Sequence, residues 1–417
     1  MSPLMLLLVL LVVAYIGGHW AAAPGKRAFG SASGVEYVVL GIVLGPRGLM
    51  LLNESVLSTF EPVSLVALGW IALGYGVEVG AVGDQGVQRG PVLGGLFLTG
   101  LVAFATAACV AWLVHPRYPD IHTIDFMLLC AGVGLVSATS VRDAVVWVSE
   151  RYGADGPMTR WLVDFSRADD APVLVALCFV FALFHPPQTV AGYELSAPLV
   201  ALGSLATGAL LGLIAAWLIA HSVSRVEGWT ILLGSALLCT GASESVGLSA
   251  MGACFALGIS LSLRTRAAEL VRKKLASTEG PVLLPALLLA GAYLEPPRHA
   301  GGWWVLAIAT LARFSVTLIA GHGFGFALRR PRREVTALAF GLLSPGTLSV
   351  IVGFDLFLRF HGQAGRATLA AAFLGTLLGE LLGAPALRRV LTLGGELARN
   401  PVTLPPPPAP VASEGSP

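Results

Sequence analysis

Long apolar segments recur along nearly the whole chain of 417 residues, and they constrain the fold more than any other feature. Hydrophobic residues make up 55% of the sequence, and charged residues make up only 12%. A soluble domain carries about 25% charged residues. Apolar runs of roughly 15–25 residues span a bilayer as helices, because a helix satisfies its own backbone hydrogen bonds. We therefore predict an all-α polytopic membrane protein.

Thirteen segments have the length and apolar character of membrane spans. They lie near residues 3–18, 34–51, 61–80, 91–114, 124–141, 160–184, 195–220, 228–246, 248–263, 281–295, 302–326, 335–358 and 367–391. The first segment has the alternative of a signal peptide, but it lacks a positively charged start, and we expect a retained helix. The Pro-rich segment 401–417 is predicted to be a disordered tail.

The distribution of basic residues supports this count. With the N-terminus outside and the C-terminus in the cytoplasm, the cytoplasmic segments hold nineteen of the 26 Lys and Arg residues and the outer segments hold five. The remaining two, Arg167 and Arg313, fall inside spans. Cytoplasmic loops of membrane proteins are enriched in Lys and Arg, and one span more or fewer would scramble the partition. We expect this orientation in a bacterial cytoplasmic (inner) membrane.

The order of the spans predicts two inverted repeats. Spans 1–6 and 8–13 can be overlaid, with span 7 as a linker near residues 195–220. The fifth span of each half is interrupted by small, polar or helix-breaking residues, VSATS at 136–140 and LSPGT at 343–347. Paired interruptions of this kind indicate a binding site near the membrane midplane. The residues of interest in these two breaks are Ala138, Thr139, Ser140, Ser344, Gly346 and Thr347.

Span 160–184 concentrates charge in an apolar context. Asp164, Arg167, Asp169 and Asp170 fall within seven residues of it. Each such charge costs roughly 2.5–3.5 kcal/mol at a bilayer centre on insertion scales. These side chains must therefore face protein or a hydrated cavity, where we expect them to handle an ion or a proton.

Four motifs resemble those of the monovalent cation:proton antiporter superfamily, in its sodium/hydrogen exchanger-like, paired-Asp branch. They are GIVLGPRGL at 41–49, LGWIALGYGVE at 68–78, ADDAPVL at 168–174 and GLSAMGACFALG at 247–258. The resemblance implies a scaffold that carries the dimer contact (about 1–80 and 228–295) and a core (about 91–184 and 302–391). It also implies two crossing broken helices, a homodimer and a core that moves against the scaffold.

The resemblance and the depth in the span make Asp170 the candidate for a shared site. An ionised carboxylate offers hard oxygen ligands to a monovalent cation, and a protonated one does not. The resemblance pairs the first carboxylate of the motif with a basic residue, which predicts an ion pair between Asp169 and Arg313. On a continuous helix Arg167 reaches both Asp164 and Asp170, so it either pairs with them or lines an access funnel. Thr139, Ser140 and Thr347 either ligate the cation or bond to their own helix.

The sequence thus predicts a secondary active transporter that exchanges Na⁺ or K⁺ for H⁺ by alternating access. An ion channel, or a cation or pH sensor, with the antiporter fold but without coupled transport is the alternative. We expect no cofactor and no enzymatic activity, because the sequence holds no metal motif, nucleotide loop or nucleophile triad. The net charge of +2 gives no argument for a nucleic-acid partner.

Overall fold

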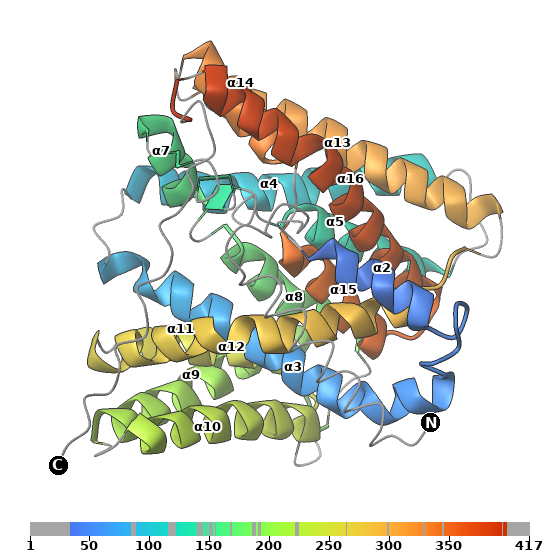
Figure 1. Cartoon of the computed structure of the whole chain (residues 1–417). Coiled ribbons are helices and arrows are strands. Elements are labelled where there is room, and N and C mark those ends of the chain that lie inside the picture. Colours follow the sequence, from blue (N-terminus) through green and yellow to red (C-terminus); the bar gives the residue numbers. More distant parts are fainter. Residues whose placement is uncertain are drawn as a thin grey trace.

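The computed structural model is an α-helical bundle with one short antiparallel pair of strands (Figure 1). The structure describes residues 34–84, 89–115, 122–139, 145–146, 148–149, 153–154, 156–166, 169–185, 189–190, 193–221, 225–263, 265–297, 300–327, 329, 331–343, 346–393 and 395–397.

The helices of the first half are α2 (Val35–Leu44), α3 (Glu54–Gly80), α4 (Arg89–Val114), α5 (Thr123–Ser137), α7 (Pro157–Phe165), α8 (Ala171–Phe184) and α9 (Ala197–His221). A 3-10 helix, η1 (Ala81–Asp84), extends α3, and strands β1 (Thr189–Val190) and β2 (Tyr193–Glu194) pair between α8 and α9. The second half holds α10 (Arg225–Val246), α11 (Ala250–Ser262), α12 (Thr265–Ala292), α13 (Ala300–Ala327), α14 (Arg332–Gly341), α15 (Thr347–Arg359) and α16 (Gln363–Leu393).

The all-α polytopic fold class is confirmed. Within the described residues, α3, α4, α9, α13 and α16 contain stretches long and apolar enough to cross a membrane, and five shorter apolar helices lie among them. Predicted segments two to thirteen each overlap described helices. The first segment and the tail lie outside the described residues, so the total of thirteen spans stays a prediction.

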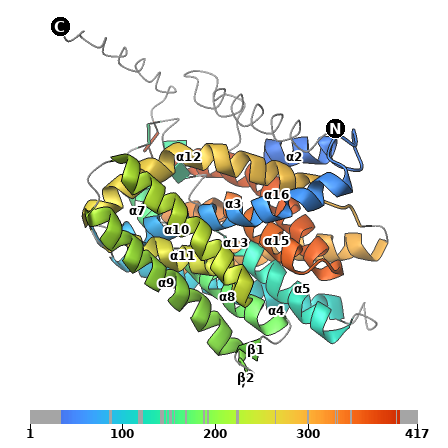
Figure 2. The ribbon, with the colours of Figure 1, turned by 90° about the horizontal axis from the view of Figure 1, so that it is seen from below.

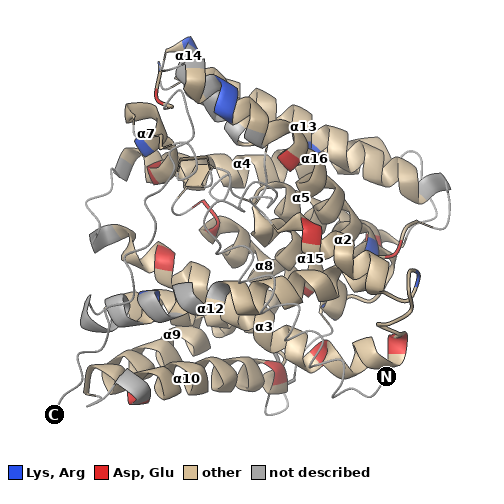
Figure 3. Cartoon of the chain, in the orientation of Figure 1, with Lys and Arg blue, Asp and Glu red and all other residues tan. Residues whose placement is uncertain are grey.

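Large apolar side chains cover the outward faces of these helices. Phe104 and Trp112 are each 76% exposed, and Ile319 is 73% exposed. Charged side chains are sparse along the same helices (Figure 3). A soluble protein would not expose apolar surface on this scale, whereas lipid is an adequate solvent for it.

The helices pack in two groups (Figures 1 and 2). In the first group α3 packs on α11 and α12, α12 also packs on α2, and α9 packs on α10 and α11. In the second group α4, α5, α13, α14, α15 and α16 contact one another, and α7 packs on α4. Helix α8 lies between the groups, against α4 and α5 on one side and α9 and α11 on the other.

Glycines bring the backbones of α3 and α11 into contact. A Cβ atom at position 76 would lie 2.1 Å from the Phe255 carbonyl oxygen, and one at position 258 would lie 2.3 Å from the Leu73 carbonyl oxygen. Small residues allow this kind of close helix approach in membranes, where packing rather than hydrophobic exclusion drives helix association.

Two of the predicted spans each form two helices, and the break in one of them was not predicted. The 335–358 segment forms α14 and α15 with a break between them, as predicted. The 160–184 segment also forms two helices, α7 and α8, separated by a turn near Ser166 and Asp170. Pro172 explains the second break, because a proline has no N–H for the preceding turn and its ring clashes with the carbonyl four residues earlier.

Candidate ion-binding site

The paired carboxylates lie at the N-terminus of α8. Asp169 and Asp170 are 1% and 4% exposed, in the turn between α7 and α8. Asp170 occupies the N-cap position, and its backbone oxygen accepts a hydrogen bond from the Leu174 N–H at 3.2 Å. Its carboxylate does not cap the first turn of α8. The positive end of the helix dipole nevertheless favours negative charge at this position.

Helix α4 presses closely on this turn. A Cβ atom at Gly95 would lie 2.3 Å from the Phe165 carbonyl oxygen and 3.4 Å from the Asp169 Cβ. The absence of a side chain at Gly95 therefore lets α4 approach the acidic turn, and it fixes the side of the turn on which Asp169 lies.

The two interrupted helices meet through a buried hydrogen bond. Helix α5 ends at Ser137, and the Val136 carbonyl oxygen accepts a hydrogen bond from the Ser349 hydroxyl of α15 at 2.7 Å. Gly346 is the buried N-cap residue of α15, and Thr347 is its first residue. The C-terminus of α5 and the N-terminus of α15 thus lie together, with opposite partial charges at their ends.

Helices α8 and α15 also meet at their C-terminal ends. The Arg359 guanidinium carbon lies 5.0 Å from the centroid of the Phe181 ring. Asp170 precedes Phe181 by eleven residues, and Thr347 precedes Arg359 by twelve. At about 1.5 Å per residue, each N-terminus lies roughly 16–18 Å back along its own helix. Measured along its own helix, the acidic turn is therefore about as far from the Phe181–Arg359 contact as the break before α15 is.

Thr347 connects the site to the first group of helices. The Tyr75 hydroxyl of α3 and the Thr347 Oγ1 form a hydrogen bond of 3.2 Å. Tyr75 also lines a cleft between α3 and α12, together with Glu78 and Arg272. Sequence reasoning missed both Tyr75 and Ser349, although each lies in or beside a motif that it had singled out.

The predicted ion pair between Asp169 and Arg313 is absent from this structure. Arg313 lies on α13 and is 3% exposed, but no described carboxylate lies within 4.0 Å of its guanidinium nitrogens. Its Nε and Nη2 atoms have no hydrogen-bond partner among the described residues. The reason is packing: a Cβ atom at Gly375 would lie 2.6 Å from Nη1, so the guanidinium fills the space that this glycine leaves beside α16.

Some of the remaining predicted site residues lie within the described residues, and others lie outside them. Asp164 is half-buried on α7, and Ala138 and Thr139 are buried just after α5. The Thr139 hydroxyl donates to the Val136 carbonyl oxygen at 3.3 Å, so it bonds to its own helix end. Ser140, Arg167 and Ser344 lie outside the described residues. The helical spacing that related Asp164 to Asp170 does not apply, because α7 and α8 are separate helices.

The polar groups described above donate oxygen atoms. Within the described residues, no group of three or more His, Cys, Asp or Glu side chains is arranged to hold a metal ion. The acidic turn offers two buried carboxylates, and the adjoining ends of α5 and α15 offer a carbonyl and hydroxyl groups. Hard oxygen groups of this kind bind alkali cations and protons.

The fold and the site together define a polytopic membrane protein of the antiporter type. A structure of the sodium proton antiporter MjNhaP1 from Methanocaldococcus jannaschii at pH 8 superposes with a TM-score of 0.67 at 15% identity, covering 94% of this chain and 99% of that one. An electron-microscopy structure of the same antiporter superposes with a TM-score of 0.65 at 14% identity, covering 96% and 100%. At these identities the likeness concerns the fold.

The sequence itself establishes the family. The profile of the family described as "Sodium/hydrogen exchanger, transmembrane" matches residues 8–389, nearly the whole chain. The chain therefore belongs to the sodium/hydrogen exchanger family, a family of transporters rather than of enzymes. No curated protein gave a significant match.

Proposed function

We propose that the protein exchanges a monovalent cation, Na⁺ or K⁺, for H⁺ across the membrane by alternating access, with Asp170 as the shared binding site. The observation that carries the proposal is the pair of buried carboxylates at the N-terminus of α8, in a family of sodium/hydrogen exchangers. Ionisable side chains within membrane spans are costly to bury, and in transporters they mark ion pathways and proton relays.

Competition at one carboxylate couples the two ions. The ionised Asp170 side chain holds the cation through its oxygens, and protonation removes the charge that holds it. Occupation by one ion therefore excludes the other, and a site that opens to one side at a time exchanges them. Asp169 serves as a second acidic group in the same turn, and the ends of α5 and α15 supply further oxygens from Thr139 and Thr347.

The packing in two groups supports a moving core. We infer that α7 and the site-bearing helix α8 move together with α4, α5, α13, α14, α15 and α16 against the scaffold of α2, α3, α10, α11 and α12, with α9 as the linker. Tyr75 and Thr347 meet across this division through a single hydrogen bond of 3.2 Å, a contact that can break at small cost. The cleft beside Tyr75 is the candidate cytoplasmic approach to the site.

Proteoliposomes with a trapped pH-sensitive dye test the proposal. A gradient of NaCl, KCl or LiCl should drive proton flux in the wild type, a choline chloride gradient should not, and Asp170→Asn should abolish the flux. Asp125→Asn, which removes an exposed acid near the start of α5, is the matched control and should leave the flux unchanged.

Three outcomes contradict the proposal. Wild-type exchange in Asp170→Asn would remove Asp170 from the mechanism. A cation current without proton coupling would identify a channel. Cation-dependent thermal stabilisation without any flux would identify a sensor.

A further inference from the structure

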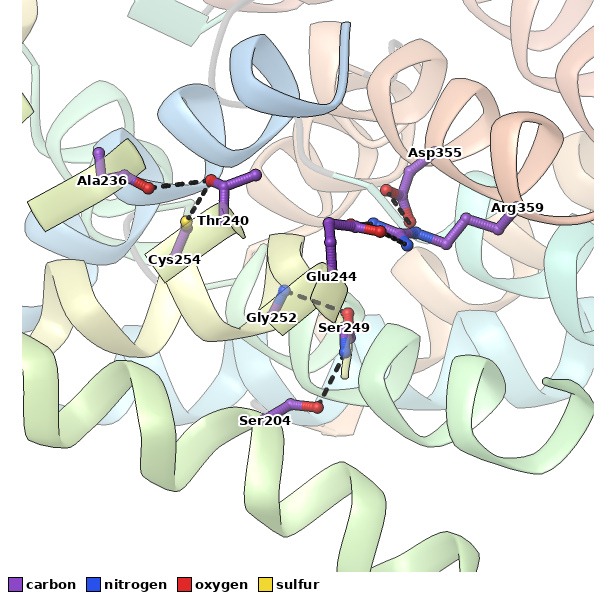
Figure 4. Close-up of polar contacts among 9 residues, drawn as sticks. All are labelled: Ser204, Ala236, Thr240, Glu244, Ser249, Gly252, Cys254, Asp355 and Arg359. Carbon is purple, nitrogen blue, oxygen red and sulfur yellow. Dashed lines mark hydrogen bonds and ion pairs between the residues drawn. The ribbon is translucent and has the colours of Figure 1, made fainter. Parts of the chain in front are cut away.

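A buried charge cluster joins the two helix groups at the end of the bundle that the basic-residue distribution predicts to be outer (Figure 4). Arg359, at the C-terminus of α15, donates from Nη1 and Nη2 to the two carboxylate oxygens of Glu244 on α10, at 3.0 and 2.5 Å. Its Nε donates to Asp355, one turn earlier on α15, at 3.3 Å. We call Glu244, Asp355 and Arg359 the outer charge cluster.

We propose that the outer charge cluster holds the outer side of the transport pathway closed, and that Asp355 is the positioning residue that keeps Arg359 compensated when this closure opens. The inference rests on the proposed function, because it assigns the cluster a place in the alternating-access cycle. It goes beyond that function because it concerns residues away from the ion-binding turn.

The three side chains divide unequally between the helix groups. Arg359 and Asp355 belong to the same helix, and Arg359 also stacks over Phe181 of α8 at 5.0 Å. Only Glu244 belongs to the other group, on α10. A relative movement of the groups therefore breaks the Glu244 contact and leaves the Asp355 contact intact.

Burial determines what this separation costs. The Arg359 side chain is 7% exposed and that of Asp355 is 2% exposed, whereas that of Glu244 is 32% exposed. Separation of a buried ion pair is unfavourable chiefly because a charge is left without a partner in a medium of low dielectric constant. Here Asp355 retains the guanidinium and water can hydrate Glu244, so neither charge is stranded. The closure is specific, because it is bidentate, and it remains reversible.

Two neighbouring pairs of side chains extend the contact between the helix groups. His361, just after α15, lies 3.8 Å from a carboxylate oxygen of Glu61 on α3. Arg366 on α16 donates to Glu295, which follows α12, at 2.9 Å. Both pairs join the C-terminal end of α15 and the start of α16 to the first helix group, and His361 and Arg366 are much more exposed than Arg359. We therefore expect Glu244 and Arg359 to dominate the closure, because exposed pairs contribute little.

The proposal predicts opposite effects for the two acids. Glu244→Gln removes the contact between the groups and should favour the outer-open state. Among the described residues, Asp355→Asn leaves Arg359 with Glu244 as its only carboxylate partner, so opening would strand a buried guanidinium, and the closed state should be favoured. A merely structural role predicts the same direction for both variants, since each breaks an ion pair.

Cys178 is a native reporter for the opening. It is fully buried on α8, and a Cβ atom at Gly252 of α11 would lie 1.9 Å from its sulfur, so it sits in a tight contact between α8 and the scaffold. The other four cysteines, Cys109, Cys130, Cys239 and Cys254, are free thiols that can be replaced by alanine or serine. A membrane-impermeant maleimide added to the outer side of cells then reports the exposure of Cys178 alone.

The experiment compares labelling rates in this single-cysteine background. Glu244→Gln should label roughly tenfold faster than the parent, equivalent to about 1.4 kcal/mol, and Asp355→Asn should label more slowly. Glu244→Asp, which keeps the charge, should fall between the parent and Glu244→Gln. Asp125→Asn is the matched control: it removes an exposed carboxylate near the start of α5 that takes no part in the outer charge cluster, and it should leave the rate unchanged.

The outcomes are separable from those of the transport assay. Rates that shift in the same direction for Glu244→Gln and Asp355→Asn, or that do not shift, overturn the proposal, provided that both variants elute as the parent does in size-exclusion chromatography. A Glu244 variant that fails this check is replaced by the milder Glu244→Asp, and an Asp355 variant by Asp355→Ser, which also removes the charge, with the same expected directions. Opposite shifts in a protein that shows no exchange would uphold the closure and reject the proposed transport.

Discussion

Two buried arginines on this chain lie in opposite electrostatic settings, and their replacement by methionine should change stability in opposite directions. Arg313 is 3% exposed and has no carboxylate within 4.0 Å among the described residues, with Nε and Nη2 lacking hydrogen-bond partners. Replacement of buried charge by apolar groups of similar volume is often stabilising by about 1–4 kcal/mol. Arg313→Met should therefore raise the free energy of unfolding by an amount in this range.

Arg359 supplies the matched control, because it is similarly buried but contacts two carboxylates. Arg359→Met leaves Asp355 buried without its counter-charge, which should destabilise the protein by about 3–5 kcal/mol. Thermal unfolding in detergent, followed by tryptophan fluorescence, should show the midpoint rising for Arg313→Met and falling for Arg359→Met. If Arg313→Met lowered the midpoint as much as Arg359→Met does, Arg313 would have an anionic partner and the reasoning would fail.

Three further predictions follow from particular contacts. Glu396→Ala removes the carboxylate that accepts hydrogen bonds from the Met158 and Thr159 N–H groups at 2.8 Å. The variant should lower the free energy of unfolding by about 0.5–2 kcal/mol and make the chain beyond α16 more sensitive to protease. Unchanged proteolysis would contradict this prediction. Ser349→Ala removes a buried hydroxyl that donates to the Val136 carbonyl oxygen, and it should lower the free energy of unfolding by about 1–3 kcal/mol, as measured by thermal unfolding. An unchanged unfolding midpoint would mean that the Thr139 hydroxyl alone satisfies this oxygen. Gly76→Ala should sharply lower the midpoint of thermal unfolding, because its Cβ would meet a carbonyl oxygen of α11 at 2.1 Å. Gly74→Ala on the same helix has open space around it, so it should leave the midpoint unchanged or raise it. Equal effects of the two variants would argue against the close α3–α11 contact.

The sequence alone was sufficient to predict most of the helices and the family. The length of an apolar segment and the positions of basic residues beside it are local features of the chain. Segment 91–114 coincides closely with α4, and segment 61–80 ends where α3 ends but begins seven residues after the start of α3. The break before α15 was also foreseeable, since Pro345 and Gly346 are strong helix breakers. The break before α8 had a comparable signal in Pro172, but the apolar run around it was interpreted as a single helix.

The side-chain partners could not be derived in the same way. Glu244 and Arg359 are 115 residues apart, and their contact depends on how α10 and α15 pack. The predicted Asp169–Arg313 pair is not made in this structure for a related reason. The direction in which Arg313 points is decided by the space beside Gly375, and the side of the acidic turn that faces α4 is decided by Gly95. Helical periodicity fixes the face of one helix and leaves the neighbour of that face undetermined.

Proton release on cation binding tests the central claim most directly. Purified protein in weakly buffered detergent solution, at a pH where Asp170 is partly protonated, should release protons when NaCl or KCl is added. Asp170→Asn should release none, and choline chloride should have no effect on either protein. Cation binding without proton release in the wild type, or equal release from Asp170→Asn, would show that H⁺ and the cation do not compete for this carboxylate.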